Sequence, residues 1–117
     1  MAIAAAGLFV SKGFGGVKTM FGLIGKMTAK AGQRDALMAL VMDGADEMPG
    51  CVSYIVAKAV DNDNDIWITE VWDSEASHAN SLKLPAVTAA INKAMPLLDM
   101  TAESFQARTE PVGGKGL

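Results

Sequence analysis

The stretch from Asn64 to Pro85 changes its hydrophobic period half-way along, and this change constrains the fold most. Its first half alternates as a strand does, with one face carrying Ile66, Ile68, Glu70 and Trp72 and the other Trp67, Thr69 and Val71. Asp73 or Ser74 can then cap a helix, and Glu75 adds negative charge where the helix dipole favours it. Trp72 is thereby placed at the junction of sheet and helix, where a small α+β domain can open a pocket.

The remaining strands follow from similar alternating or apolar runs. We expect them over residues 21–28, 51–59 and 101–109, the last at a sheet edge. In the second of these, alternation predicts Val52, Tyr54, Val56 and Lys58 on one face and Cys51, Ser53, Ile55 and Ala57 on the other. The polar run 61–65, reading DNDND, predicts the turn of a hairpin.

Helical periodicity predicts helices over residues 33–48, over 74–83 and from Pro85 onwards, with Pro96 kinking or ending the last. Gly44 falls inside the first, where it would let the helix press closely on the sheet. The inner stripe of the second is predicted to be Ala76, Ala79 and Leu82. The order is β-α-β-β-α-β, the ferredoxin-like arrangement, in which helices cover one face of an antiparallel four-stranded sheet.

Composition favours a small protein that pairs with itself. A chain of 117 residues makes one domain, and half of its residues are hydrophobic. The mean hydropathy of +0.25 is high for a small monomer. The open sheet face would be largely apolar, so we expect a homodimer in which two sheets pack face to face. The net charge of -3 and pI near 5.0 argue against nucleic acid and anionic membranes as partners.

The domain is expected to span residues 20–112, with an N-terminal extension over 1–19 and a flexible tail over 113–117. The apolar run 2–10 is too short to span a bilayer and lacks the preceding positive charges of a signal peptide. Two alternatives stay open for this extension. It could form an extra strand or an arm on a partner subunit, or the true start of the protein could be Met20. The single cysteine, Cys51, requires no oxidising compartment, so a cytoplasmic protein is expected.

No metal site is expected. Asp61, Asp63 and Asp65 have the spacing that begins a calcium loop. Such a loop continues with a glycine and closes with an acid, and those positions hold Ile66 and Trp72. One cysteine and one histidine cannot form a zinc-type cluster.

Several short motifs together resemble the antibiotic biosynthesis monooxygenase family. They are Thr28 before Lys30-Ala31-Gly32, residues 48–54 (MPGCVSY), residues 70–76 (EVWDSEA), Leu84-Pro85 and Pro96-Leu97-Leu98. The resemblance covers about residues 20–112 and implies a dimeric α+β barrel. It further implies oxidation of a quinol-like or polycyclic aromatic molecule by oxygen without any cofactor.

The chain departs from the family pattern at its histidines. Many members carry histidines at the positions of Ser81 and Ala86, whereas here His78 precedes Ser81 by nearly one helical turn, where the family usually has an apolar residue. Members that degrade haem use an asparagine and a histidine at roughly the positions of Gly25 and Ile91, so haem degradation is not expected.

Four residues are candidates for the site, each with a structural alternative. Trp72 would stack on a flat substrate or simply fill the core. Tyr54 would hydrogen-bond a quinol oxygen, or place its hydroxyl in water. Glu70 would be a buried base of raised pKa, or an exposed cross-strand partner of a cation. His78 would transfer protons, or lie on the helix surface.

These residues leave three functions open. The first is a cofactor-independent monooxygenase in which Trp72 and Tyr54 shape the pocket and Glu70 or His78 is the catalytic base. The second is a non-catalytic dimer that binds a small molecule or acts as a stress accessory protein, which the residues at Ser81 and Ala86 favour. The third is an isomerase of a small carbonyl compound, because one fold hosts several chemistries.

Overall fold

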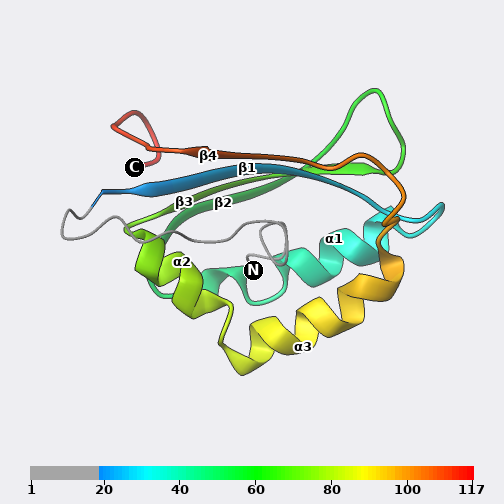
Figure 1. Cartoon of the computed structure of the whole chain (residues 1–117), viewed down its shortest axis with the longest axis horizontal. Helices are drawn as coiled ribbons and strands as arrows, with labels where there is room; N and C mark the ends of the chain where they lie inside the picture. The colour runs from blue at the N-terminus through cyan, green and yellow to red at the C-terminus, as the bar shows by residue number, and fades with distance from the viewer. Residues whose placement is uncertain (1–18) are drawn as a thin grey trace.

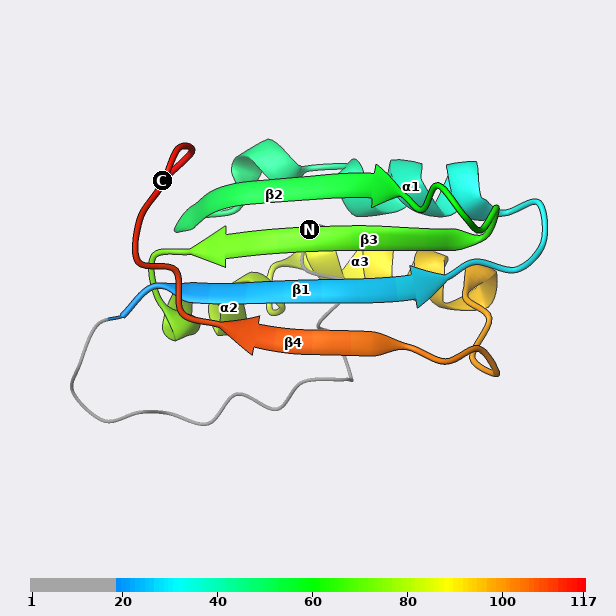
Figure 2. The ribbon, with the colours of Figure 1, turned by 90° about the horizontal axis from the view of Figure 1, so that it is seen from above.

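A computed structural model describes residues 19–117, so most of the predicted extension over 1–19 lies outside the described residues. The chain forms a four-stranded antiparallel sheet whose strands lie in the order β2-β3-β1-β4 (Figure 2). The elements are β1 (Phe21–Thr28), α1 (Arg34–Met42), β2 (Cys51–Lys58), β3 (Asp65–Trp72), α2 (Glu75–Ser81), α3 (Pro85–Ala94) and β4 (Phe105–Thr109). All three labelled helices lie on one face of the sheet (Figure 1). The predicted ferredoxin-like α+β fold is confirmed.

The inner face of the sheet carries the core because strand side chains alternate between the two faces. Two clusters of buried side chains fill the space between the sheet and the helices. One, nearer to α1, centres on Leu37, Val41, Ile66 and Ile68. The other, at the end where β3 leads into α2, contains Phe21, Leu23, Met48, Trp72, Val87 and Ala90. The predicted helix start at Pro85 and the end before Pro96 are confirmed, since α3 ends at Ala94.

The first helix is shorter than predicted. It ends at Met42, and a separate 3-10 turn follows at Ala45–Glu47. Gly44 is the cause, because its φ of 72° lies in the left-handed region that glycine enters at little cost. The prediction that Gly44 packs a continuous helix against the sheet was therefore wrong. A Cβ at this position would meet nothing within 4 Å.

Two predictions about side-chain direction were wrong in part. The fully buried residues of α2 are His78 and Ser81. Of the predicted stripe, Leu82 is partly buried and packs against the cluster around Trp72, whereas Ala76 is exposed. In β2, a bulge between Cys51 and Ser53 interrupts the alternation. Cys51 consequently packs against the buried cluster around Trp72 on the inner face, and Val52 is the extra residue.

The C-terminal strand is also shorter than expected. It begins at Phe105, because residues 101–104 form turns and irregular backbone. Its position at the edge of the sheet, beside β1, is confirmed.

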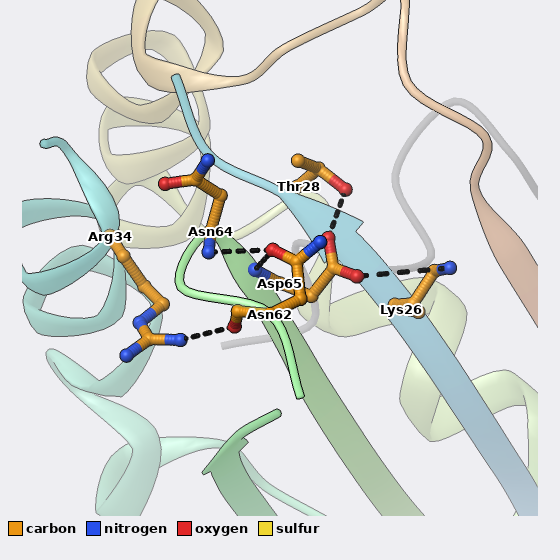
Figure 3. Close-up of polar contacts among 6 residues, drawn as sticks. All are labelled: Lys26, Thr28, Arg34, Asn62, Asn64 and Asp65. Carbon is orange, nitrogen blue, oxygen red and sulfur yellow. Dashed lines mark hydrogen bonds and ion pairs between the residues drawn. The ribbon is translucent and has the colours of Figure 1, made fainter. Parts of the chain in front are cut away.

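The DNDND run forms the predicted hairpin turn between β2 and β3 (Figure 3). The side-chain oxygen of Asn62 accepts hydrogen bonds from the backbone N–H groups of Asn64 at 2.8 Å and Asp65 at 3.2 Å. The Asp65 carboxylate accepts a hydrogen bond from Thr28 and lies 4.0 Å from the Lys26 ammonium. This carboxylate therefore ties the hairpin to the end of β1.

Candidate active site

The strand register gathers the predicted site residues at one end of the inner face. One cross-strand row, from β2 to β4, consists of Tyr54, Glu70, Leu23 and Arg108. The next row, nearer to α2, consists of Cys51, Trp72 and Phe21. Helix α2 then places His78 against Phe21 and Trp72. All four predicted residues thus belong to one buried group of side chains, with Trp72 between Glu70 and His78.

Glu70 is a buried carboxyl group, only 1% exposed. The indole N–H of Trp72 donates a hydrogen bond to its Oε1 at 3.1 Å, while Oε2 has no hydrogen-bond partner among the described residues. Burial raises the pKa of Glu70 to about 7, and the hydrogen bond from Trp72 opposes that rise only in part. The alternative of an exposed cross-strand ion pair was wrong, because Glu70 lies on the helix-covered face.

Trp72 is fully buried, so its predicted place in the core is confirmed. Its hydrogen bond to Glu70 and its edge-to-face contact with the His78 imidazole, at a centroid distance of 5.5 Å, give it a second role. The indole fixes the direction of the carboxyl group on one side and that of the imidazole on the other.

His78 is 2% exposed, so the prediction of a surface histidine was wrong. Its ring stacks on Phe21 at a centroid distance of 4.7 Å and an interplanar angle of 22°. Neither ring nitrogen has a hydrogen-bond partner in the described part of the chain. Burial lowers the pKa of His78 to about 4, although the nearby Glu75 carboxylate acts in the opposite direction, so the imidazole is neutral at physiological pH.

Ser81 lies one helical turn after His78 on the same buried face, and its hydroxyl donates to the His78 carbonyl at 2.6 Å. A histidine at either position would therefore point into the interior. The departure from the family pattern moves the imidazole along the helix without turning it towards solvent.

The Tyr54 hydroxyl is buried and, within residues 19–117, has no hydrogen-bond partner. The prediction that it lies in water was therefore wrong. Burial, reinforced by the Glu70 carboxylate, raises the pKa of Tyr54 above its usual range, so the phenol keeps its proton and can act as a hydrogen-bond donor.

The Pro-Gly turn before β2 holds the start of α2 in place. Gly50 has a φ of 83°, and its carbonyl accepts a hydrogen bond from the Asp73 N–H at 2.9 Å. A Cβ at Gly50 would lie 2.5 Å from the side chain of Ser77. Ser74 is the N-cap of α2, because its hydroxyl accepts a hydrogen bond from the Ser77 N–H at 3.1 Å. These local contacts set where α2, and with it His78, meets the sheet.

Sequence reasoning missed Phe21 and Arg108 as parts of this site. The Arg108 guanidinium pairs with the Glu75 carboxylate at 3.0 Å, and its Cζ lies 4.9 Å from the centre of the Phe21 ring. This ion pair joins β4 to the first turn of α2. Phe21 had a usable signal, because it alternates with Leu23, whereas Arg108 depends on how β4 pairs with β1.

Two surface hollows lie away from these residues, and one of them is formed by Ala31, Gly32, Arg34 and Asp35 together with Asp63 and Asn64. A shallow groove between α1 and α3 is lined by Ala36, Ala39, Leu40, Met42, Asp43 and Lys93. Across residues 19–117, no group of three His, Cys, Asp or Glu side chains could hold a metal ion. No helix in that range is long and apolar enough to cross a membrane.

Comparison with known proteins identifies the family. Residues 20–93 match the family model described as antibiotic biosynthesis monooxygenase. The chain belongs to this family. Its single-chain fold is that of the family's dimeric α+β barrels. The matched residues include Tyr54, Glu70, Trp72 and His78 but end before Arg108.

A solved structure supports the assignment at the level of sequence. A "putative antibiotic biosynthesis monooxygenase" from Chloroflexus aurantiacus is 52% identical, with a TM-score of 0.77, over 82% of this chain and 96% of that one. More distant family structures share the fold. A "putative antibiotic biosynthesis monooxygenase" from Deinococcus radiodurans is 24% identical with a TM-score of 0.66, over 80% of this chain and 94% of that one. No protein of curated function matches the chain.

Proposed function

We propose that this family member is a cofactor-independent monooxygenase that oxidises a quinol-like or polycyclic aromatic molecule with dioxygen. The observation that carries the proposal is the buried Glu70 carboxyl group, whose pKa is about 7 and whose Oε2 has no partner among the described residues. A carboxylate of that pKa is a competent base near neutral pH, because general-base catalysis works best when the pKa of the base is close to the working pH.

The reaction needs only a proton acceptor and a desolvated, oriented substrate. Glu70 takes a phenolic proton, and the resulting phenolate gives an electron to dioxygen. The two radicals join at a ring carbon, and the peroxide oxygen regains the proton as a hydroperoxide. Loss of water then leaves a new carbonyl on that carbon, so that a hydroquinone and O₂ yield a hydroxyquinone and H₂O. The aromatic substrate itself supplies all the electrons.

The other side chains have supporting roles in this scheme. Trp72 directs the Glu70 carboxyl group through its 3.1 Å hydrogen bond and, with Phe21, offers an apolar aromatic wall. Tyr54 is protonated and lies beside Glu70 across β2 and β3, where its hydroxyl can donate to the substrate oxygen. We assign the base to Glu70 and not to His78, because a base with a pKa of about 4 takes up a proton only weakly near neutral pH.

A second candidate is a non-catalytic small-molecule-binding or stress-accessory dimer. The substitution of the family's histidine positions by Ser81 and Ala86 favours it, since Ala86 is exposed and contributes nothing to the buried group. In both cases we propose a homodimer formed through the open sheet face, and a cytoplasmic location consistent with the single free cysteine.

Oxygen uptake by the purified protein tests the proposal. The wild type is mixed with a panel of hydroquinones, without flavin, metal or haem, and compared with a protein-free blank and the Trp72→Ala variant. We expect uptake above the blank in the wild type and a large loss in the variant, because Glu70 loses the partner that directs it. Uptake equal to the blank across the panel, from protein shown to be folded, would reject a quinol monooxygenase and favour the binding dimer.

A further inference from the structure

The buried group of side chains around Trp72 contains polar atoms that have no hydrogen-bond partner among the described residues. These atoms belong to different strands and to a helix. Tyr54 Oη and Glu70 Oε2 come from adjacent positions of β2 and β3, while His78 Nδ1 and Nε2 come from α2. Buried polar atoms in folded proteins nearly always have partners, because leaving them unpaired forfeits their hydration. Glu70 and His78 contact the same Trp72 indole, and Tyr54 is the cross-strand neighbour of Glu70, so these unpaired atoms point to a ligand that reaches both the sheet and the helix.

The His78 ring is held in a fixed direction. It stacks on Phe21 and meets the edge or face of Trp72 at an interplanar angle of 77°, so two aromatic rings constrain it. The Glu75–Arg108 ion pair, one turn earlier on α2, ties the same helix to β4. A neutral imidazole has one N–H donor and one acceptor nitrogen, which suits a hydroxyl or carbonyl oxygen far better than a carboxylate or phosphate.

Resting on the proposed function for the site, we infer that His78 is a specificity contact that hydrogen-bonds a second oxygen of the aromatic ligand. The first oxygen faces Glu70 and Tyr54, and the second faces the imidazole across the Trp72 indole. The site thus selects uncharged aromatic rings that carry oxygen functions at two separated positions. His78 takes no proton from the ligand in this arrangement.

Binding in the absence of oxygen tests the inference separately from turnover. The probes are 1,4-dihydroxynaphthalene and 1-naphthol, which share a ring system and differ by one hydroxyl group. Isothermal titration calorimetry under nitrogen measures each with the wild type, His78→Phe and Ser81→Ala. His78→Phe keeps an aromatic ring for the stack and removes both nitrogens, while Ser81→Ala removes a buried hydroxyl from the same helix face and leaves the imidazole.

We expect the wild type and Ser81→Ala to bind the dihydroxy probe roughly 3- to 10-fold more tightly than 1-naphthol, the worth of one net hydrogen bond. In His78→Phe the two probes should bind within about 2-fold of each other, with the affinity for 1-naphthol unchanged. A preference that persists undiminished in His78→Phe would overturn the inference, as would failure of both probes to bind the wild type.

A second readout needs no variant, because His78 is the only histidine of the chain. With ¹⁵N-histidine-labelled protein, the two imidazole nitrogens are assigned directly. We expect one nitrogen resonance to shift when 1,4-dihydroxynaphthalene binds and to stay in place when 1-naphthol binds. Identical spectra with both probes bound would reject the contact even if His78→Phe did not fold.

Oxygen uptake with the same dihydroxy probe distinguishes the two proposals. Uptake equal to the blank, together with a probe preference that depends on His78, would reject the monooxygenase and keep the specificity contact. Uptake above the blank, with a preference independent of His78, would reject the contact and keep the monooxygenase.

Discussion

Glu70 and His78 show how one buried environment shifts two groups in opposite directions. Burial disfavours the charged form of each, which is the ionised carboxyl group but the protonated imidazole. The pKa of Glu70 therefore rises from 4.5 to about 7, and that of His78 falls from 6.5 to about 4. Both side chains are neutral in weakly acidic solution, so the interior then holds no buried charge from this pair.

The pH dependence of stability should separate the two groups. The stabilisation that Glu70 contributes is complete below pH 4.5 and is lost as the pH rises to about 7, because the folded state holds the carboxyl proton more tightly than the unfolded state does. The contribution of His78 is complete above pH 6.5 and is lost as the pH falls to about 4. Between pH 4.5 and 6.5 the two slopes oppose each other in the wild type.

Urea unfolding across this pH range measures the effect. In the wild type, the raised pKa of Glu70 should lower the free energy of unfolding by about 3 kcal/mol between pH 4.5 and 7, at about 1.4 kcal/mol per unit of pKa shift. The Glu70→Gln variant should not show this decrease. His78 should lower the free energy of unfolding by a similar amount between pH 6.5 and 4, and the His78→Phe variant should not show that decrease. Variants whose pH profiles run parallel to that of the wild type would show that neither group is shifted as described.

The rate of the proposed oxidation should depend on ionised Glu70. Activity above the blank should rise with pH and level off above an apparent pKa of about 7. Glu70→Gln preserves the size of the side chain and should lower the rate about 10²- to 10⁴-fold, the usual worth of a general base. The non-enzymatic rate at each pH is subtracted, since free quinols oxidise faster in alkali. A variant with the wild-type rate would exclude Glu70 as the base.

At the scale of elements, the contact between the Pro-Gly turn and α2 decides where His78 lies. Gly50 combines a positive φ with the close approach of Ser77 and Asp73. Gly44 has a similar φ, but a Cβ there would meet nothing within 4 Å. Comparing alanine substitutions at the two glycines therefore separates the cost of a left-handed backbone, which both share, from the cost of a steric clash, which only Gly50 has.

Gly50→Ala should destabilise the protein much more than Gly44→Ala. The control should lose about 1 kcal/mol, the cost of a left-handed residue. Gly50→Ala should lose at least about 2 kcal/mol and should also weaken binding of 1,4-dihydroxynaphthalene, because α2 must move away from the sheet. Thermal or urea unfolding of both variants measures the difference. Equal losses would show that the contact with α2 has no energetic role.

At the scale of the whole molecule, the sheet face opposite the helices exposes large apolar side chains. This outer face carries Ile55, which is 58% exposed, and Phe105, which is 48% exposed and in contact with Trp67 at a ring-centroid distance of 5.8 Å. Figure 2 shows that face, with no helix covering it. Its exposed apolar side chains support the proposal that two sheets pack against each other.

A charge placed on this face should dissociate the proposed dimer. Ile55→Lys introduces a buried, unpaired charge into the proposed interface, whereas Val60→Lys changes an equally apolar side chain that is fully exposed at the turn after β2. We expect sedimentation equilibrium to give a dimer for the wild type and Val60→Lys and a monomer for Ile55→Lys. A wild-type monomer, or a dimeric Ile55→Lys variant, would contradict this assembly.

The sequence alone determined the order of elements and the placing of Glu70 and Trp72 on one face of β3, because both follow from hydrophobic period and caps. It also located the hairpin turn and the starts of α2 and α3. Asn62, Ser74 and Pro85 set these features through contacts with their own neighbours along the chain. Family resemblance added the family but not the direction of individual side chains.

Tertiary structure decided which of these side chains are buried. The direction of His78 depends on how α2 rotates against the sheet, which the Gly50 and Glu75–Arg108 contacts set from residues far away in sequence. The length of α1 depends on whether Gly44 adopts a left-handed conformation, and periodicity cannot detect that choice. Burial and pKa arise from packing of distant segments, so the chemistry of Glu70 and His78 follows from the folded chain and not from local pattern.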